Sequence, residues 1–353
     1  MNILNYLTLS RSNFSAENRK IFAIEFKDNF EGLFDVLNSK FKSLMPLQSD
    51  IKKEYGNLIK NEISMLTIND EFYPKLLKTI DTVPILITFK GDKNIFNRQK
   101  IAVVGSRKLE KNDIFFIKSV IDFIKNLNFV VVSGLANGSD IISHVQSIKT
   151  GTIAVMPCGL RYCYPKENKI IEDKIVENGG AIISEYSFNE PPKHYNFIQR
   201  NRIIVGLSNS VVITRAREIK SGTMSNVKFA KEFTREIYTF NLNDNFSNGN
   251  NFLLKKRIAN EIDNFEDLKF SFIKDIAKNE IYIDKYINNF NKTFNNNLFE
   301  CERKSIQNEI NLISKNAKIK FEEKNIHKLY QICKEQLQTD GKTILLEMLK
   351  MIK

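Results

Sequence analysis

Short apolar runs that alternate with longer amphipathic stretches dominate residues 66–250 and constrain the fold more than any other feature. The runs are rich in β-branched residues and are Ile101–Val104, Phe129–Val132, Thr152–Val155, Ala181–Ile183, Ser210–Ile213 and Ile237–Phe240. The amphipathic stretches between them are Asp113–Leu127, Ser139–Lys149, Lys166–Asn178 and Thr223–Thr234. Strands of this kind alternating with helices are typical of a parallel sheet covered on both faces. The pattern predicts an α/β fold with a Rossmann-like, doubly wound, mostly parallel sheet.

The regions outside this alternation differ from it in texture. Pro84–Phe89 is a further apolar run and predicts an additional strand at the edge of the sheet. Residues 1–65 repeat apolar positions at spacings of three and four, which predicts a helical N-terminal module. We expect the Rossmann-like domain to occupy residues 66–254. Residues 255–353 lose the strand pattern and predict a helical C-terminal region, with a loop or linker at Asn288–Asn297.

The charge balance favours a polyanionic partner. Lys and Arg total 53 and Asp and Glu total 41, which gives a formal net charge of +12 and a pI near 9.3. A basic protein of this kind is suited to nucleic acid or to an anionic membrane surface. An AT-rich genome, which enriches Lys, Asn and Ile in every protein, is the alternative explanation of the same charge.

Membrane, metal and cofactor signals are weak in this sequence. Its longest apolar runs fall far below the ~20 residues of a membrane helix, and its first residues do not resemble a signal peptide. The four cysteines form no CxxC pair, and the three histidines are far apart. We therefore expect a cytoplasmic protein with reduced thiols, no metal, no cofactor and no membrane association.

Small and polar residues follow the predicted strands at their carboxyl ends, where ligands of doubly wound sheets bind. They include Gly105-Ser106-Arg107 after the first strand, Ser133-Gly134 after the second and Ser221-Gly222 after the fifth. Small residues let a ligand approach backbone N–H groups at helix N-termini, which suit phosphate. The pattern predicts a phosphate-binding edge; ordinary βα turns, which also favour Gly and Ser, are the alternative.

Nucleotide chemistry and catalysis have little support in the motifs. Gly105 is not followed by Gly-x-Gly-x-x-Gly, and no P-loop is present. Glu185 and Asp140 are possible general bases, but neither has a nucleophile or metal ligand nearby in the sequence. His144 falls within a predicted helix, where a structural role is expected.

The segment Pro191–Leu207, PPKHYNFIQRNRIIVGL, combines cations with aromatic residues. Its cations are Lys193, Arg200 and Arg202, and its aromatic residues include Tyr195 and Phe197. Cations neutralise phosphates and aromatic faces stack unpaired bases, which together indicate single-strand binding. The alternative is that the same residues form a helix with a buried apolar face and solvated charges.

The chain contains an ordered set of motifs that runs from Tyr73 to Leu254: YPKLL, VVGSR, SGLANGSD, TIAVMPCGL, SEY, FIQRNRIIVGLS, SGT and NGNNFLL. This ordered set resembles the DprA/Smf family across about 180 residues. The resemblance implies a non-enzymatic protein that binds and protects single-stranded DNA. It also implies help in loading the RecA recombinase during DNA uptake, transformation or recombination, and a homodimer formed through the Rossmann-like domain.

The resemblance also implies particular DNA-binding residues. Gly105, Ser106 and Arg107 match the family's DNA-contacting turn, and Lys193 and Phe197 match its basic and base-stacking positions. The remaining expected site residues are Ser133, Gly134, Ser221, Gly222 and the family's strongest signature, Arg200, Asn201 and Arg202.

Departures from the family pattern lie at the same edge. Arg161 and Arg215 stand where carboxylates are usual, Ser225-Asn226 stands for Thr-Ala, and Asn241-Leu242 stands for Pro-Gly. Two arginines in place of two carboxylates predict a more basic edge, which favours a polyanion. The alternatives are a scaffold that binds a partner, or a phosphoribohydrolase of the related lysine-decarboxylase-like group. The expected Pro-Gly-Gly before Gly-Thr, and the catalytic Glu after it, are not found in the IKSGTMSN segment.

Overall fold

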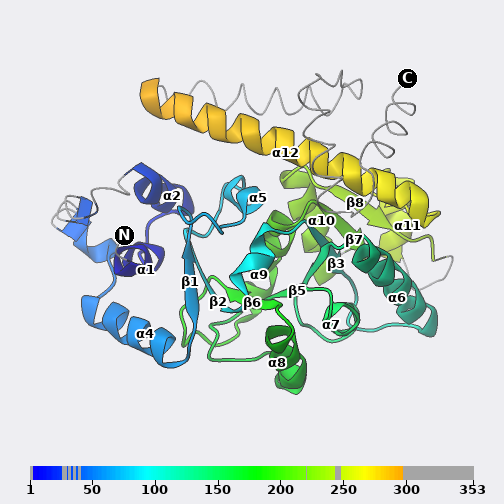
Figure 1. Ribbon diagram of the computed structural model, residues 1–353, viewed down its shortest axis with the longest axis horizontal. Coiled ribbons are helices and arrows are strands. Elements are labelled where there is room, and N and C mark those ends of the chain that lie inside the picture. Colours follow the sequence, from blue (N-terminus) through cyan, green and yellow to red (C-terminus); the bar gives the residue numbers. More distant parts are fainter. Residues whose placement is uncertain are drawn as a thin grey trace. The chain divides into compact units, whose positions relative to one another are not determined.

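The computed structural model contains one nine-stranded sheet in the order β1-β2-β6-β5-β4-β3-β7-β8-β9 (Figure 1). It describes residues 3–25, 30, 33–34, 37–38, 41–219, 221–242 and 248–296. The strands are β1 (Ser64–Thr67), β2 (Leu86–Gly91), β3 (Lys100–Val104), β4 (Val130–Ser133), β5 (Thr152–Val155), β6 (Ala181–Ser184), β7 (Ser210–Ile213), β8 (Glu236–Thr239) and β9 (Asn260–Glu261).

The strands from β6 to β9 are parallel, and the chain order reverses at β3. β3 lies between β4, which follows it in the chain, and β7, which is reached only after the sheet has been built outward to β6. Ile101, Val103 and Val132 are fully buried, because both faces of these central strands are covered. The predicted Rossmann-like, doubly wound α/β fold is confirmed.

β2 is an interior strand, so the prediction of an edge strand at Pro84–Phe89 was wrong. β2 pairs antiparallel with β6 on one side and with β1 on the other. β1 covers the open edge of β2, and Ser64–Thr67 was overlooked because only two of its four residues are buried. Its short, half-exposed pattern carries little hydrophobic signal.

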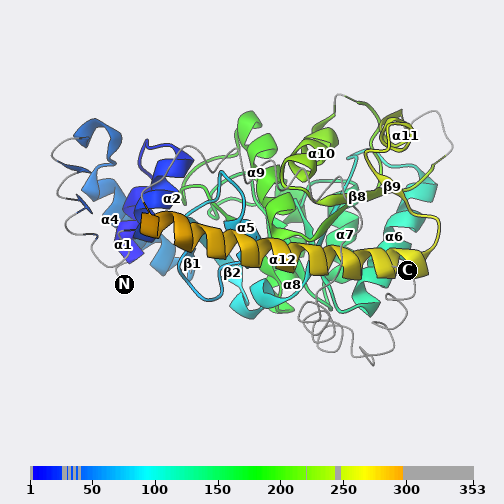
Figure 2. The same cartoon turned by 90° about the horizontal axis from the view of Figure 1, so that it is seen from above.

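Helices cover the two faces of the parallel sheet. α6 (Lys111–Asn126), α7 (Ser139–Ser147) and α8 (Lys169–Glu177) lie on one face, where α7 packs against both α6 and α8. α9 (His194–Leu207) and α10 (Gly222–Glu232) cover the other face and pack side by side (Figure 2). Shorter elements complete this region: α5 (Lys75–Lys78), η2 (Lys93–Asn97), η3 (Lys166–Asn168) and α11 (Asn248–Lys255).

The N-terminal helices belong to the same compact unit as the sheet, Met1–Phe265. They are α1 (Ile3–Ser10), α2 (Ala16–Glu25), η1 (Lys42–Leu44) and α4 (Gln48–Lys60). Tyr6 and Leu7 of α1 are fully buried, and α1 contacts both β1 and β2. The Tyr6 hydroxyl also accepts a hydrogen bond of 2.6 Å from the Asn69 side chain, which follows β1.

The second compact unit, Glu266–Lys353, is described only in part. Its described portion is the helix α12 (Phe265–Asn296), so the loop predicted at Asn288–Asn297 was wrong at least as far as Asn296. The remainder of the predicted helical C-terminal region lies outside the described residues. Within the described residues, no helix combines the length and the apolar composition that crossing a membrane requires.

Candidate nucleic-acid interface

The turn after β3 lies at the point where the order of the strands reverses. A Cβ atom added to Gly105 would lie 2.1 Å from Thr214 Oγ1 and 2.4 Å from Ser139 Oγ. These two hydroxyls are 2.7 Å apart and hydrogen-bonded to each other. Gly105 therefore allows β3, the end of β7 and the start of α7 to meet, which leaves Arg107 exposed at the edge.

A pocket of about 170 Å³ opens beside Arg107. The Arg107 guanidinium lies 5.8 Å from the centroid of the half-buried Phe197 ring, and the Tyr164 ring meets Phe197 edge-on with centroids 5.1 Å apart. Cation–π and edge-to-face contacts of this kind hold aromatic rings in place. The full lining is Arg107, Gly134, Ala136, Asn137, Tyr164, Pro165, Glu167, Phe197 and Arg200.

Arg200 contributes to this lining although its side chain is only 4% exposed. Its Nη1 donates to the carbonyl oxygens of Gly134, at 2.7 Å, and of Val155. Burial lowers the pKa of Arg200, and the carboxylate of Asp140 opposes that shift. A Cβ on Gly134 would lie 2.1 Å from Arg200 Nη1, so Gly134 is required by the close approach of the guanidinium.

Asp140 binds the backbone N–H groups after β4, which the sequence pattern had predicted to bind phosphate. Its carboxylate accepts from the Gly134 N–H, at 3.2 Å, and from the Ala136 N–H. Burial raises the pKa of Asp140, and these hydrogen bonds and the Arg200 charge oppose the shift. The Asp140 carboxylate therefore holds this turn. The Gly134 and Ala136 N–H groups are bonded to it and are not available to a phosphate.

His144 is hydrogen-bonded inside the protein through both ring nitrogens. It is fully buried in α7, and its Nε2 accepts the Leu135 N–H at 3.3 Å. Its Nδ1 lies 2.7 Å from Thr152 Oγ1, which itself donates to the Val131 carbonyl. Burial lowers the pKa of His144 to about 3. The ring is therefore neutral at physiological pH, with its proton on Nδ1.

Lys193 is exposed immediately before α9. Its Nζ lies 3.0 Å from Glu190 Oε1, with the two side chains 59% and 25% exposed. The same Glu190 oxygen accepts from Asn196 Nδ2 at 3.2 Å. Lys193 is not among the residues that line the pocket, but it lies on the segment that leads into Phe197.

Three further predicted site residues are buried and bonded inside the protein. Ser133 is fully buried, and its hydroxyl donates to the Val103 carbonyl at 2.7 Å. Asn201 Nδ2 donates to Ser225 Oγ at 2.8 Å, and Arg202 Nη2 lies 2.5 Å from Glu185 Oε2. These contacts hold the three side chains inside the protein at the edge of the sheet.

Ser221 and Gly222 lie at the start of α10, where Ser221 is the N-cap residue and Gly222 is exposed. No atom lies within 4 Å of a Cβ placed on Gly222, so a ligand can approach this backbone. Neither residue lines the pocket. The structure thus brings Arg107, Gly134, Phe197 and Arg200 together in the pocket lining, which does not include Lys193, Ser221 or Gly222.

The prediction that Arg215 makes the edge more basic was wrong. Its side chain is 1% exposed, and its Nε lies 2.5 Å from Oδ2 of Asp113, which is fully buried. The charge is therefore compensated inside the protein. Arg161 is exposed, and it donates to Asn189 Oδ1 at 3.0 Å.

Sequence reasoning did not single out Tyr164 as a site residue. It is 38% exposed and forms one wall of the pocket through its contact with Phe197. The signal available in the sequence was an aromatic residue followed by proline, Tyr164-Pro165, between the third predicted strand and the next predicted helix. No group of three His, Cys, Asp or Glu side chains in the described ranges is arranged to hold a metal ion.

The sequence model of the family described as DNA recombination-mediator protein A matches residues 64–272, from β1 into α12. This chain belongs to the DNA recombination-mediator protein A family. The match contains the whole pocket and the whole sheet, and the resemblance inferred from the motifs is confirmed.

Individual members of the DNA recombination-mediator protein A family are similar to this chain along much of their own length. DNA processing protein DprA of Streptococcus pneumoniae is 36% identical over 194 residues, which cover 54% of this chain and 68% of that protein. The X-ray structure of DNA processing protein A from the same organism has a TM-score of 0.62 at 28% identity, covering 76% of this chain and 98% of the other. Its counterpart from Helicobacter pylori, described for its single-stranded DNA binding mode, has a TM-score of 0.55 at 27% identity, covering 61% and 97%.

Proposed function

We propose that this protein binds single-stranded DNA at the pocket formed by Arg107, Tyr164 and Phe197. The observation that carries the proposal is the exposed Arg107 guanidinium 5.8 Å from the centroid of the half-buried Phe197 ring. A cation beside an accessible aromatic face suits a phosphate and the unpaired base attached to it. In a duplex both faces of each base are stacked, so the same site favours single strands.

The predicted residues divide into two roles. Exposed or partly exposed groups contact DNA: Gly105, Ser106, Arg107, Lys193, Phe197, and the backbone of Ser221 and Gly222. Buried groups hold the edge in shape: Ser133, Gly134, Arg200, Asn201 and Arg202. Stacking on an aromatic ring contributes about 1–3 kcal/mol per base, so Phe197 is assigned a large share of the binding free energy.

Family membership supports a cellular role as a recombination mediator. In this role the protein protects single-stranded DNA and helps to load RecA, during DNA uptake and transformation or during recombination. We assign its action to the cytoplasm, where these substrates occur, and assign a homodimer through the Rossmann-like domain.

The contacts of the two candidate bases favour binding over catalysis. Glu185 pairs with Arg202, and the Asp140 carboxylate accepts two backbone N–H groups. A general base needs a free carboxylate within reach of its substrate, and both are engaged internally. Release of a free base from a nucleoside monophosphate would instead support the phosphoribohydrolase alternative.

A salt titration tests the proposal. Fluorescence anisotropy of a labelled single strand is expected to show affinity that falls with salt at a log–log slope of about −0.7 per phosphate neutralised. Arg107→Ala is expected to weaken binding to many sequences alike, whereas Lys118→Ala, an exposed cation on α6, serves as the matched control. Binding that is independent of salt, or equal loss in both variants, would contradict the proposal.

A further inference from the structure

A mostly buried ion pair joins two of the N-terminal helices. Arg11 directly follows α1, and Glu54 lies in α4. Arg11 Nε and Nη2 lie 3.1 Å and 2.9 Å from Glu54 Oε1, and the two side chains are 11% and 12% exposed. Removing such charges from water is costly unless further hydrogen bonds satisfy them. The partners of the remaining donors and acceptors therefore matter.

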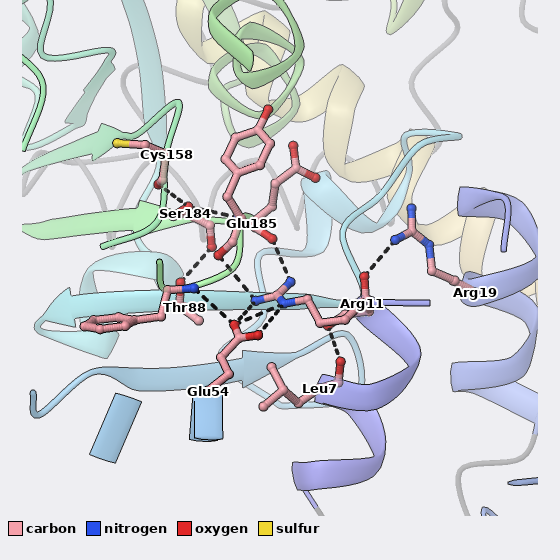
Figure 3. A network of polar contacts seen from close by, with 11 residues as sticks. Leu7, Arg11, Arg19, Glu54, Thr88, Cys158, Ser184 and Glu185 are labelled. Atoms are coloured by element: carbon pink, nitrogen blue, oxygen red, sulfur yellow. Dashed lines mark hydrogen bonds and ion pairs between the residues drawn. The ribbon is translucent and has the colours of Figure 1, made fainter. Parts of the chain in front are cut away.

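Those partners are backbone groups of the segment that follows β6. Arg11 Nη1 donates to the Glu185 carbonyl at 2.9 Å, and Nη2 donates to the Tyr186 carbonyl at 3.3 Å. Glu54 Oε1 accepts the Phe188 N–H at 3.1 Å. Figure 3 shows the Arg11 guanidinium between the Glu54 carboxylate and the Glu185 backbone. One ion pair thus holds two carbonyls and one N–H of residues 185–188.

The same segment contacts the first turn of α9. The Tyr186 hydroxyl donates to the Asn196 carbonyl at 3.3 Å, and Glu190 Oε1 accepts from Asn196 Nδ2 at 3.2 Å. Asn196 is 3% exposed and directly precedes Phe197. Arg11 is therefore linked through Tyr186 to Asn196, the residue that directly precedes Phe197.

We propose that the Arg11–Glu54 pair is a positioning device for the binding site. It fixes residues 185–190 and, through Asn196, sets the orientation of Phe197 and Lys193. This inference rests on the proposed function, because its consequence is measured as binding to single-stranded DNA. It gives the N-terminal helices a role in binding although none of their residues lines the pocket.

Loss of the pair is expected to lower the fraction of molecules whose site is correctly arranged. Apparent affinity falls in proportion to that fraction, so an arrangement present in about one tenth of molecules weakens binding about ten-fold. Stacking on Phe197 is the interaction most sensitive to orientation. The preference for single strands over duplex is therefore expected to fall together with the affinity.

Two variants separate positioning from general stability. Arg11→Lys keeps the charge but carries its donors on one nitrogen, which cannot reproduce the planar fork that contacts Glu54, Glu185 and Tyr186 at once. Arg11→Glu combined with Glu54→Arg restores the attraction between the charges but places each of them against the wrong backbone group. Lys90→Gln is the matched control, because it removes a partly buried ion pair to Glu172, 3.2 Å long, that does not contact the segment.

The measurements are single-strand affinity, amide exchange in residues 185–190 and unfolding free energy, all on the full chain. Arg11→Lys and the charge swap are expected to bind about ten-fold more weakly, with faster exchange in the segment, whereas Lys90→Gln binds like the unmodified protein. The swap is expected to regain stability relative to Arg11→Glu alone without regaining affinity.

Two results would overturn the inference. One is unchanged affinity in variants whose segment exchanges faster, and the other is a charge swap that restores affinity together with stability. If the unmodified protein does not bind single strands, the proposed function fails. Exchange of residues 185–190 in Arg11→Lys then still decides whether the pair holds the segment: faster exchange supports this, and unchanged exchange refutes it.

Discussion

Two adjacent parallel strands, β3 and β7, are each followed by an arginine, and the two arginines differ completely in their surroundings. Arg107 is exposed beside the Phe197 ring, whereas Arg215 is 1% exposed and bonded to Asp113. Only Arg107 can neutralise the charge of a ligand. The difference shows that the electrostatic character of an edge depends on which charges are compensated inside the protein, and not on how many the sequence places there.

Breaking the Arg215 pair is expected to give the largest effect, and the effect is on stability. Asp113→Asn removes the carboxylate that pairs with the buried Arg215 guanidinium and accepts the Glu110 N–H at the start of α6, so the free energy of unfolding in urea is expected to fall by about 3–5 kcal/mol. The matched control is Arg217→Ala, whose pair with Glu110 is 32% and 45% exposed and worth at most about 1 kcal/mol. Equal losses in the two variants would show that Arg215 is not compensated as described.

Arg107→Ala is expected to weaken binding of single-stranded DNA and to leave the stability of the fold nearly unchanged. Single-strand affinity is expected to fall by at least about ten-fold, because a hydrogen bond to a charged group contributes about 1.5–3 kcal/mol. The free energy of unfolding changes by less than about 0.5 kcal/mol, because the side chain is exposed. Anisotropy titrations and urea unfolding of the same preparation check both parts. A large loss of stability without a loss of affinity would reverse the roles of the two arginines.

The buried His144 is expected to make the free energy of unfolding depend on pH. Burial lowers its folded pKa to about 3, against an ordinary value of 6.5, so between these values the unfolded chain binds a proton that the folded chain does not. Stability from this group is therefore present above pH 6.5 and is lost as the pH falls. Unfolding free energy is expected to be lower at pH 5.5 than at pH 7.5 by about 1.4 kcal/mol.

The pH effect is assigned by comparing two histidine variants. His144→Gln removes the buried group, whereas His194→Gln removes an exposed ring from the first residue of α9. Only the first is expected to flatten the dependence of the unfolding free energy on pH. Identical slopes in the unmodified protein and in His144→Gln would assign the dependence to other groups.

The smallest expected effect concerns Lys193, whose charge is shared with Glu190 across 3.0 Å. Glu190→Gln frees the ammonium for a phosphate, so single-strand affinity at low salt is expected to rise about two-fold, in line with the ~0.2–1 kcal/mol of exposed pairs. The gain disappears at high salt, where exposed charges are screened. Lys193→Gln in the same background should cancel it, and a gain that survives this change would exclude Lys193 as its source.

Sequence patterns predicted the central strands closely, because these strands are short, β-branched and buried on both faces. Thr152–Val155 and Ser210–Ile213 have the same bounds in prediction and structure. The antiparallel extension was misjudged because β1 has only two buried residues, so its pairing with β2 is visible only in three dimensions.

The residues that line the pocket were predictable where they lie next to a strong local sequence signal. The turn Gly105–Arg107 follows a strong strand signal, and Phe197 follows a basic, aromatic segment. The burial of Arg215 was not predictable, because its partner Asp113 lies 102 positions away. Arg200 and Arg202 have the composition of a nucleic-acid site but the surroundings of a protein core.

The most direct test of the central claim is the strand preference of the unmodified protein and of Phe197→Ala. Affinity is measured for one oligonucleotide as a single strand and annealed to its complement, at equal salt. The protein is expected to prefer the single strand, and Phe197→Ala is expected to lose most of that preference, since stacking contributes about 1–3 kcal/mol per base. Equal binding to both forms, or a preference that persists in Phe197→Ala, would contradict the claim that the Arg107–Phe197 pocket recognises unpaired bases.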